Sequence, residues 1–225
     1  MPRAFSLPLV YVIYPFIMIG AVASCYRVTG GQLNPIITLA HLFRKDKPEG
    51  FDYIVGGIYM LAQAVGCGVG IPLVWWFTRE IGVDIKPVRR TNGDYQVSEA
   101  IGYEIFGSFL VVLAYLMVSS KVTSPTKDPG SQAMLIGTSS SAIMYTTYSV
   151  TGGGLDPFYV FSHACWRAID HDTDTSFDYI YIYLLFPPLG ALIALAVHRF
   201  ILLPGTEKSY RDIEQDGQVV EANKV

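Results

Sequence analysis

The sequence predicts an all-α membrane protein built from an inverted repeat, with five transmembrane helices and two re-entrant half-helices. Of its 225 residues 51% are apolar, and the mean hydropathy of +0.36 is high for a soluble domain. A glycine-rich motif also occurs twice, as T-G-G-Q-L-N-P over Thr29–Pro35 and as T-G-G-G-L-D-P over Thr151–Pro157. A membrane helix interrupted at corresponding positions in the two halves of a chain is typical of inverted-repeat transporters and channels.

The apolar segments give the predicted helices. A membrane helix needs about 20 residues, and five segments reach this length: Leu7–Tyr26, Tyr53–Phe77, Val97–Ser119, Gln132–Val150 and Tyr179–Leu203. The fourth is rich in Ser and Thr, so we expect it to pack inside the bundle, where small hydroxyl residues allow close contact. Ile36–Phe43 and Phe158–Trp166 are too short to cross a membrane and are predicted to be half-helices.

Each motif has the residues needed to start a short helix. Its glycines permit a tight backbone turn. Asn34 and Asp156 then follow, and both residue types cap the free N–H groups of a helix N-terminus. Pro35 and Pro157 fall at the first helical position, where no N–H donor is required. We therefore predict that Asn34 and Asp156 approach each other near mid-membrane from opposite sides.

The two motifs, completed by Ile36 and Phe158, resemble the paired Asn-Pro-Ala boxes of the aquaporin (major intrinsic protein) family. Further marks of the resemblance are Ala62-Gln63 with Gly66, and Pro188-Leu189-Gly190-Ala191. The resemblance implies that the half-helix N-termini meet at a pore centre, where Asn34 would donate to a passing water. Asp156 departs from the family pattern, because an ionised carboxylate cannot donate.

The resemblance also implies a selectivity filter. Its four positions fall on Tyr14, Met144, Gly153 and Tyr159. Tyr159 replaces the arginine usual in the family, and Phe158 replaces a small alanine. We expect these bulky groups to make a constriction narrower than a water molecule. A scaffold role is implied for Gln63 and Glu104, and Glu104 is expected to accept backbone N–H bonds from the loop of the second motif.

The repeat also predicts that one helix is missing. Glu104 resembles the glutamate in the opening helix of an aquaporin repeat and lies 52 positions before Asp156, whereas 52 positions before Asn34 falls ahead of Met1. We therefore expect the first repeat to lack its opening helix. The vacant side should adjoin the spans Leu7–Tyr26 and Gln132–Val150, and a helix from another membrane subunit should cover it. The predicted division is a truncated first repeat (1–78), a connecting loop (79–96), a second repeat (97–203) and a polar tail (204–225) expected to lie against a partner.

Other functions find little support in the sequence. A net charge of −3 gives no reason to propose nucleic acid as a partner, and the three cysteines lack paired spacing. Asp170–Asp174 opens like a calcium loop but lacks its later Gly and Glu, so no metal, cofactor or enzymatic activity is expected. Two functions stay open for this lipid-embedded protein: a non-conducting structural subunit of a larger membrane complex, or alternatively a water or small neutral solute channel. The membrane itself is left open, as a plasma membrane or an organelle membrane such as the mitochondrial inner membrane.

Overall fold

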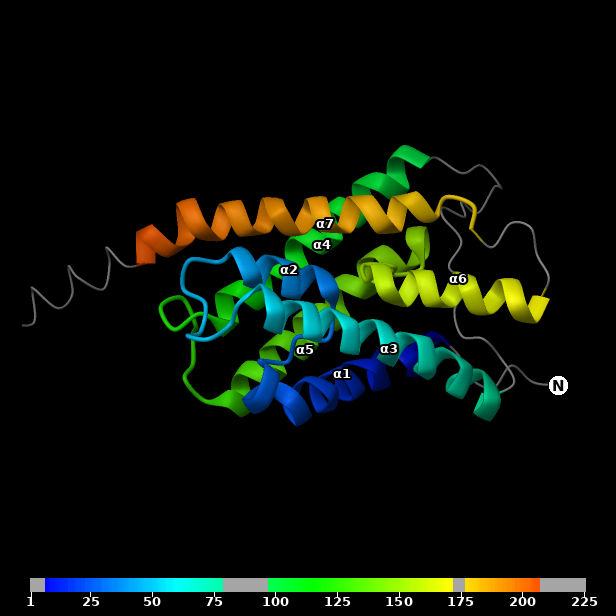
Figure 1. Ribbon diagram of the computed structural model, residues 1–225, viewed down its shortest axis with the longest axis horizontal. Helices are drawn as coiled ribbons and strands as arrows, with labels where there is room; N and C mark the ends of the chain where they lie inside the picture. Colours follow the sequence, from blue (N-terminus) through cyan, green and yellow to red (C-terminus); the bar gives the residue numbers. More distant parts are fainter. Residues whose placement is uncertain (1–6, 79–96, 172–176, 207–225) are drawn as a thin grey trace, which may run out of the picture.

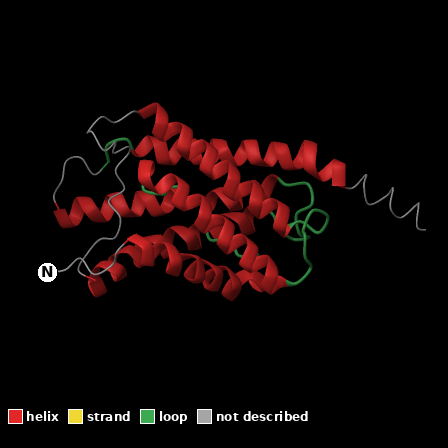
Figure 2. Ribbon diagram, turned by 180° about the vertical axis from the view of Figure 1, so that it is seen from behind, coloured by secondary structure: helices red, strands yellow, loops and turns green. Residues whose placement is uncertain are grey.

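The computed structural model describes residues 7–78, 97–171 and 177–206, and these ranges contain helices and connections without strands (Figures 1 and 2). The helices are α1 (Leu7–Thr29), α2 (Pro35–Phe43), α3 (Tyr53–Thr78), α4 (Val97–Ser119), α5 (Pro129–Thr151), α6 (Pro157–His171) and α7 (Ile180–Val197). A π-helical turn, η1 (His198–Leu202), prolongs α7. The predicted connecting loop 79–96, residues 172–176 of the acidic run and the tail from 207 onward lie outside the described residues.

Four described helices are long and apolar enough to cross a membrane. They are Val12–Thr29 of α1, Tyr53–Phe77 of α3, Val97–Ser119 of α4 and Ile180–Thr206, which contains α7. The remaining predicted span, Gln132–Val150, corresponds to α5. The 23 residues of α5 suffice in length, although its composition is more polar.

Several hydroxyl groups of α5 donate to carbonyl groups of the helix itself. Ser141 Oγ donates to the Gly137 carbonyl at 2.8 Å, and Thr147 Oγ1 donates to the Met144 carbonyl at 2.9 Å. Thr146 Oγ1 does the same toward the Ile143 carbonyl at 2.7 Å. Such back-bonding inside a helix satisfies Ser and Thr without a second helix. These bonds satisfy part of the polarity of α5, and a partner on that side stays a prediction.

Two close helix contacts organise the bundle. The α1–α5 pair meets at Gly137, where an added Cβ would lie 2.7 Å from the Cα of Ile19. The α4–α7 pair meets at Gly190, where an added Cβ would lie 3.0 Å from the Phe109 nitrogen. Because α4 also packs against α5, it joins the two pairs, and its buried Val112 belongs to the main core.

The two motif loops share one backbone conformation. Gly30 and Gly31 have φ of 72° and 69°, and Gly152 and Gly153 both have φ of 74°. Residues other than glycine rarely adopt this left-handed backbone conformation. Each loop thus turns the chain out of a long helix and into a half-helix, α2 or α6, and the two half-helices lie on opposite sides of the point where the loops meet (Figure 1).

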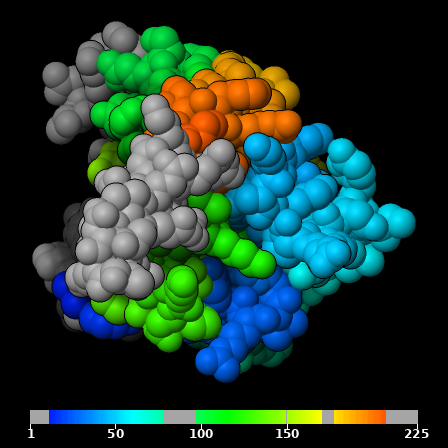
Figure 3. All heavy atoms as spheres, turned by 90° about the vertical axis from the view of Figure 1, so that its left-hand side faces the viewer, coloured from blue at the N-terminus to red at the C-terminus, as the bar shows by residue number. Residues whose placement is uncertain are grey.

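A buried arginine fixes the end of α2. Arg44, only 3% exposed, donates from Nε and Nη2 to Asp46 at 2.9 and 2.7 Å and from Nη1 to Ser119 Oγ at 2.7 Å. Arg199 Nη1 donates to the Phe43 carbonyl at 3.3 Å, which joins the end of α7 to the same region. Figure 3, seen from this end, shows the light-blue end of α2 beside the orange end of α7.

Candidate functional site

The two motif loops are joined by the side chain of Asn34. Its Oδ1 accepts from the Ile36 N–H at 3.0 Å and so caps α2, while its Nδ2 donates to the Leu155 carbonyl at 2.9 Å. A primary amide carries two N–H donors, and the Leu155 carbonyl takes one of them. Asn34 therefore holds its own half-helix and the opposite loop at once, and the motif loops meet as the sequence predicts.

Asp156 caps the other half-helix. Its Oδ1 accepts from the Phe158 N–H at 2.9 Å and from the Tyr159 N–H at 3.1 Å. The positive end of a helix dipole favours a carboxylate at this place. Asn34 and Asp156 thus perform the same capping task with different chemistry, since only the amide also donates.

Side chains from three long helices hold the motif loops. On α3, Gln63 Nε2 donates to the Gln32 carbonyl at 2.7 Å and to Thr38 Oγ1 at 2.9 Å. This contact gives Gln63 the position of a scaffold residue for the first motif. The α4 residue Tyr115 donates from its hydroxyl to the Gly30 carbonyl at 2.9 Å.

The matching support of the second motif is a tyrosine of α7. Tyr183 donates from its hydroxyl to the Thr151 carbonyl at 3.1 Å, and its side chain is 1% exposed. Sequence reasoning missed both Tyr115 and Tyr183. Each lies within an apolar run of a spanning helix, where nothing in the residue pattern separates it from tyrosines that face lipid, such as Tyr181, which is 45% exposed.

Glu104 does not hold the second motif in the way we expected. Its carboxyl group is fully buried on α4, but within the described residues neither oxygen accepts a hydrogen bond. The loop of the second motif instead packs against α4 one turn further on, where Leu155 and Thr147 lie around Gly107. Tyr183 donates to the Thr151 carbonyl, so this end of the second motif is held by a hydroxyl donor and not by the carboxylate acceptor that we expected.

The four predicted filter positions gather around the second motif in two pairs. Met144 packs onto Gly153, where an added Cβ would lie 2.6 Å from the methionine Cγ. Tyr14 lies within electrostatic range of Tyr159 and Asp156, and its ring meets that of Tyr145 edge-on at 5.8 Å. The chain thus brings bulky groups together beside the junction, and their role as a filter stays a prediction.

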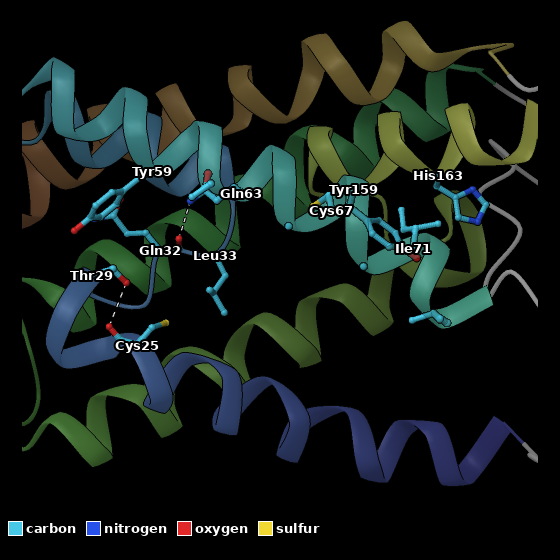
Figure 4. A pocket seen from close by; sticks show the side chains of 14 residues that line it. Cys25, Thr29, Gln32, Leu33, Tyr59, Gln63, Cys67, Ile71, Tyr159 and His163 are labelled. Carbon is cyan, nitrogen blue, oxygen red and sulfur yellow. Dashed lines mark hydrogen bonds between the residues drawn. The ribbon is translucent and has the colours of Figure 1, made fainter. Parts of the chain in front are cut away.

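A lateral cavity of about 590 Å³ opens beside this junction (Figure 4). We call it the α1–α3 groove. Most of its lining residues lie on α3, and the rest come from the C-terminal end of α1, the first motif loop and α6. The lining residues are Cys25, Thr29, Gln32, Leu33, Tyr59, Ala62, Gln63, Gly66, Cys67, Gly70, Ile71, Val74, Tyr159 and His163. The filter position Tyr159 therefore borders this cavity.

The groove does not lie where we expected a vacant side, which should adjoin α1 and α5. It lies between α1 and α3, while α5 packs directly on α1, and a vacant side left by a missing helix stays a prediction. Metal ligands do not contribute to the site: within the described ranges, no three His, Cys, Asp or Glu side chains converge.

Two capped half-helices that meet inside a bundle of membrane-crossing helices define a membrane protein of the channel or transporter class. A family profile described as "Major intrinsic protein" matches residues 3–198. The chain belongs to the major intrinsic protein family and is an integral membrane protein. This family consists of channels, and the prediction that the chain is not an enzyme is confirmed.

Relatives and a solved structure agree with this family. The chain is 29% identical over 198 residues to "Probable aquaporin PIP2-6" of Arabidopsis thaliana, covering 83% of this chain and 63% of that protein. It is 30% identical over 183 residues to "Aquaporin PIP2-7" of the same plant, covering 78% of this chain and 61% of that protein. The chain thus matches less than two thirds of the length of these relatives. Its fold is similar to that of the aquaglyceroporin from Plasmodium falciparum, with a TM-score of 0.72 at 17% identity over 88% of this chain and 83% of that one.

Proposed function

We propose that the chain is a channel for water or a small neutral solute, with its path passing between the two motif loops. The observation that carries this proposal is the bond from Asn34 Nδ2 to the Leu155 carbonyl, which brings the N-termini of α2 and α6 face to face. The similarity to proteins described as aquaporins supports the same function.

The chemistry at the junction suits a molecule that both donates and accepts hydrogen bonds. A passing water would accept from the second N–H of Asn34, which the Leu155 carbonyl leaves available. It would donate to the carboxyl group of Asp156, whose Oδ1 is held by two backbone N–H groups. Such fixed donors and acceptors replace part of the hydration of the permeant. We assign the filter positions the role of setting the width of the path.

The proposed architecture is the inverted repeat of the sequence analysis, with a truncated first half. Here α5 is one of five spans, α2 and α6 are re-entrant half-helices, and residues 1–78 hold a first repeat without an opening helix equivalent to α4. Residues 97–203 form the second repeat, joined by the loop 79–96 and followed by the polar tail. A path whose wall lacks one helix needs a neighbouring subunit to close it, because exposed backbone is costly in lipid. We therefore propose that other membrane subunits adjoin this chain.

A second candidate function is a non-conducting structural subunit of a larger membrane complex. The crowding around the second motif favours it, since Met144 packs onto Gly153 and Tyr14 lies near Tyr159. In this alternative the half-helices serve only to support the fold, and the chain contributes packing surface to its neighbours.

Osmotic permeability separates the two functions. Purified chain would be reconstituted into phosphatidylcholine vesicles, and shrinkage would be followed by stopped-flow light scattering with water and then with a glycerol gradient. A channel raises one of these rates well above that of empty vesicles. Rates equal to those of empty vesicles, in a sample shown to be folded, would favour the structural subunit. The variant Tyr159→Ala then tests whether crowding is the cause, because removing the ring should open a path that is merely blocked.

A further inference from the structure

We propose that the path between the motif loops also conducts protons, and that the carboxyl group of Asp156 takes them up and releases them at the junction. The proposal rests on the proposed function, because it uses the same path and the water that fills it. It adds a charged permeant, the proton, to water and small neutral solutes.

One oxygen of Asp156 is available at the junction. Its Oδ1 is held by the N–H groups of Phe158 and Tyr159. Its Oδ2 accepts no hydrogen bond within the described residues, and it is not fully enclosed by protein. This oxygen can therefore accept a hydrogen bond, and then a proton, from a water in the path.

The charge of Asp156 is not balanced by a basic side chain. Among the described residues no ion pair reaches Asp156. Three uncharged side chains lie within electrostatic range of it: Tyr14 of α1, Cys67 of α3 and Tyr159 of α6. Each helix N-terminus carries about +0.5 elementary charge, so the two ends that meet here balance about one carboxylate. The junction is therefore close to neutral, and two positive helix ends no longer repel an arriving proton.

An ionisable side chain inside a membrane bundle is expensive and typically belongs to an ion pathway or a proton relay. The capping task alone does not require a carboxylate, because Asn34 performs it for α2 with an amide. The property that Asp156 has and Asn34 lacks is the ability to exchange a proton. This difference favours a relay over a purely structural role for Asp156.

The pairing of Asn34 with Asp156 also leaves a chain of waters unbroken. Asn34 Nδ2 has one N–H left for a water, and this water can donate to Asp156 Oδ2. Two amide donors facing one water would occupy both of its lone pairs, and its two hydrogens would then point in opposite directions along the path. One donor and one acceptor leave the water one lone pair and one hydrogen for its neighbours. Hydrogen bonds can therefore continue through the junction in a single direction.

Conduction takes two balanced steps. A hydronium ion on one side gives its proton to the ionised carboxyl group of Asp156, which leaves a water and a neutral carboxyl group. That group then gives a proton to a water on the other side, which restores the carboxylate and forms hydronium there. Nothing is oxidised or reduced, and the net result is the movement of one positive charge across the membrane.

The junction suits a proton better than a metal cation. Filters for metal cations replace the hydration shell with rings of free carbonyl oxygens. Carbonyl groups of both motif loops instead accept hydrogen bonds from side chains, as those of Gly30, Gln32, Thr151 and Leu155 do. These four oxygens are not free to replace the hydration of a sodium ion, whereas a proton passes along hydrogen bonds and needs no such shell.

Proton flux is measured on phosphatidylcholine vesicles that hold the full chain and enclose the pH-sensitive dye pyranine. Valinomycin and an outward potassium gradient make the interior negative and draw protons inward. We expect the interior to acidify well above the rate of empty vesicles. Sodium uptake under the same potential, followed with an enclosed sodium-sensitive dye, should equal that of empty vesicles.

Asp156→Asn removes the ionisable group but keeps a side chain that caps helices well. We expect this variant to lower proton flux at least tenfold. The matched control is Asp52→Asn, because Asp52 Oδ1 caps α3 through the N–H groups of Ile54 and Val55, at 2.9 Å each, and lies outside the junction. It should keep the proton flux of the wild type.

Wild-type proton flux equal to that of empty vesicles would overturn the proposal whether or not any variant folds. Flux unaffected by Asp156→Asn, or lowered equally by Asp156→Asn and Asp52→Asn, would overturn it as well. Sodium uptake above that of empty vesicles would contradict the proton as the charged permeant. Water flux without proton flux contradicts the proton pathway alone, whereas proton flux without water or glycerol flux contradicts the proposed function alone.

Discussion

Asn34 Nδ2 and the Leu155 carbonyl lie 2.9 Å apart and join two loops separated by 121 positions in the chain. The same side chain caps α2 through its Oδ1. One residue therefore sets both the start of a half-helix and its distance from the opposite loop. No side chain other than a primary amide supplies a donor and an acceptor in this planar arrangement.

Asn34→Ala should destabilise the protein clearly. Loss of the cap costs about 1 kcal/mol, and an unsatisfied Leu155 carbonyl adds about 1–3 kcal/mol. Thermal unfolding in detergent measures the effect. For a chain of this size, each kcal/mol lost should lower the unfolding temperature by about 2–4 °C. Asn34→Asp keeps the cap but not the donor and should fall between Ala and wild type. If Asp and Ala variants melted together, the cap would contribute nothing.

Gln63→Leu removes both bonds that α3 makes to the first motif, to the Gln32 carbonyl and to Thr38 Oγ1. Each such bond contributes roughly 0.5–1.5 kcal/mol, so we expect a loss of about 1–3 kcal/mol. The matched control is Leu61→Ala, because Leu61 is on the same helix but 65% exposed on its outer face. A smaller loss for Gln63→Leu than for Leu61→Ala would speak against a scaffold role.

Tyr183→Phe deletes only the hydroxyl that donates to the Thr151 carbonyl. Because the ring is buried, the carbonyl loses its donor without gaining water, and the cost should be about 1–3 kcal/mol. Tyr181→Phe, two residues earlier and 45% exposed, should change the unfolding temperature by less than this. Equal shifts for the two variants would show that the Tyr183 hydroxyl does not support the second motif.

The ion pair at the end of α2 predicts a pH dependence. Burial alone would raise the pKa of Asp46, but its hydrogen bonds to Arg44 and the charge of that guanidinium lower it to about 2 from an ordinary 3.8. A depressed pKa stabilises the fold at pH above the ordinary value, and this stabilisation is lost as pH falls through the folded pKa. The unfolding temperature should therefore decrease between about pH 4 and pH 2, and Asp46→Asn should flatten this part of the curve. An unchanged slope in Asp46→Asn would assign the acid sensitivity to other carboxyl groups.

Much of the fold follows from the sequence because two local signals are strong. The apolar segments mark the spans to within a few residues, as in Val97–Ser119, and the Asn-Pro and Asp-Pro pairs mark the starts of α2 and α6. Hydrogen bonding obliges a chain in lipid to be helical, so length and apolarity suffice to find most of its elements.

The parts that the sequence did not predict depend on contacts between distant residues. Glu104 and Tyr183 both lie on helices next to the second motif. Only the three-dimensional packing decides that the Tyr183 hydroxyl donates to the Thr151 carbonyl, while within the described residues the Glu104 oxygens accept no hydrogen bond. The groove between α1 and α3 was not predicted either, because helix order alone does not tell which helices border a cavity.

The most direct test of the central claim, a path between the motif loops, is the osmotic permeability of vesicles containing Met144→Trp. Met144 packs onto Gly153 beside the junction, so a larger ring there should close the path and bring the rate to that of empty vesicles. Phe200→Trp, at a position 72% exposed on the outer surface, should keep the rate of the wild type. A wild-type rate above that of empty vesicles and unaffected by Met144→Trp would place the path elsewhere, and a wild-type rate no higher than empty vesicles would contradict conduction itself.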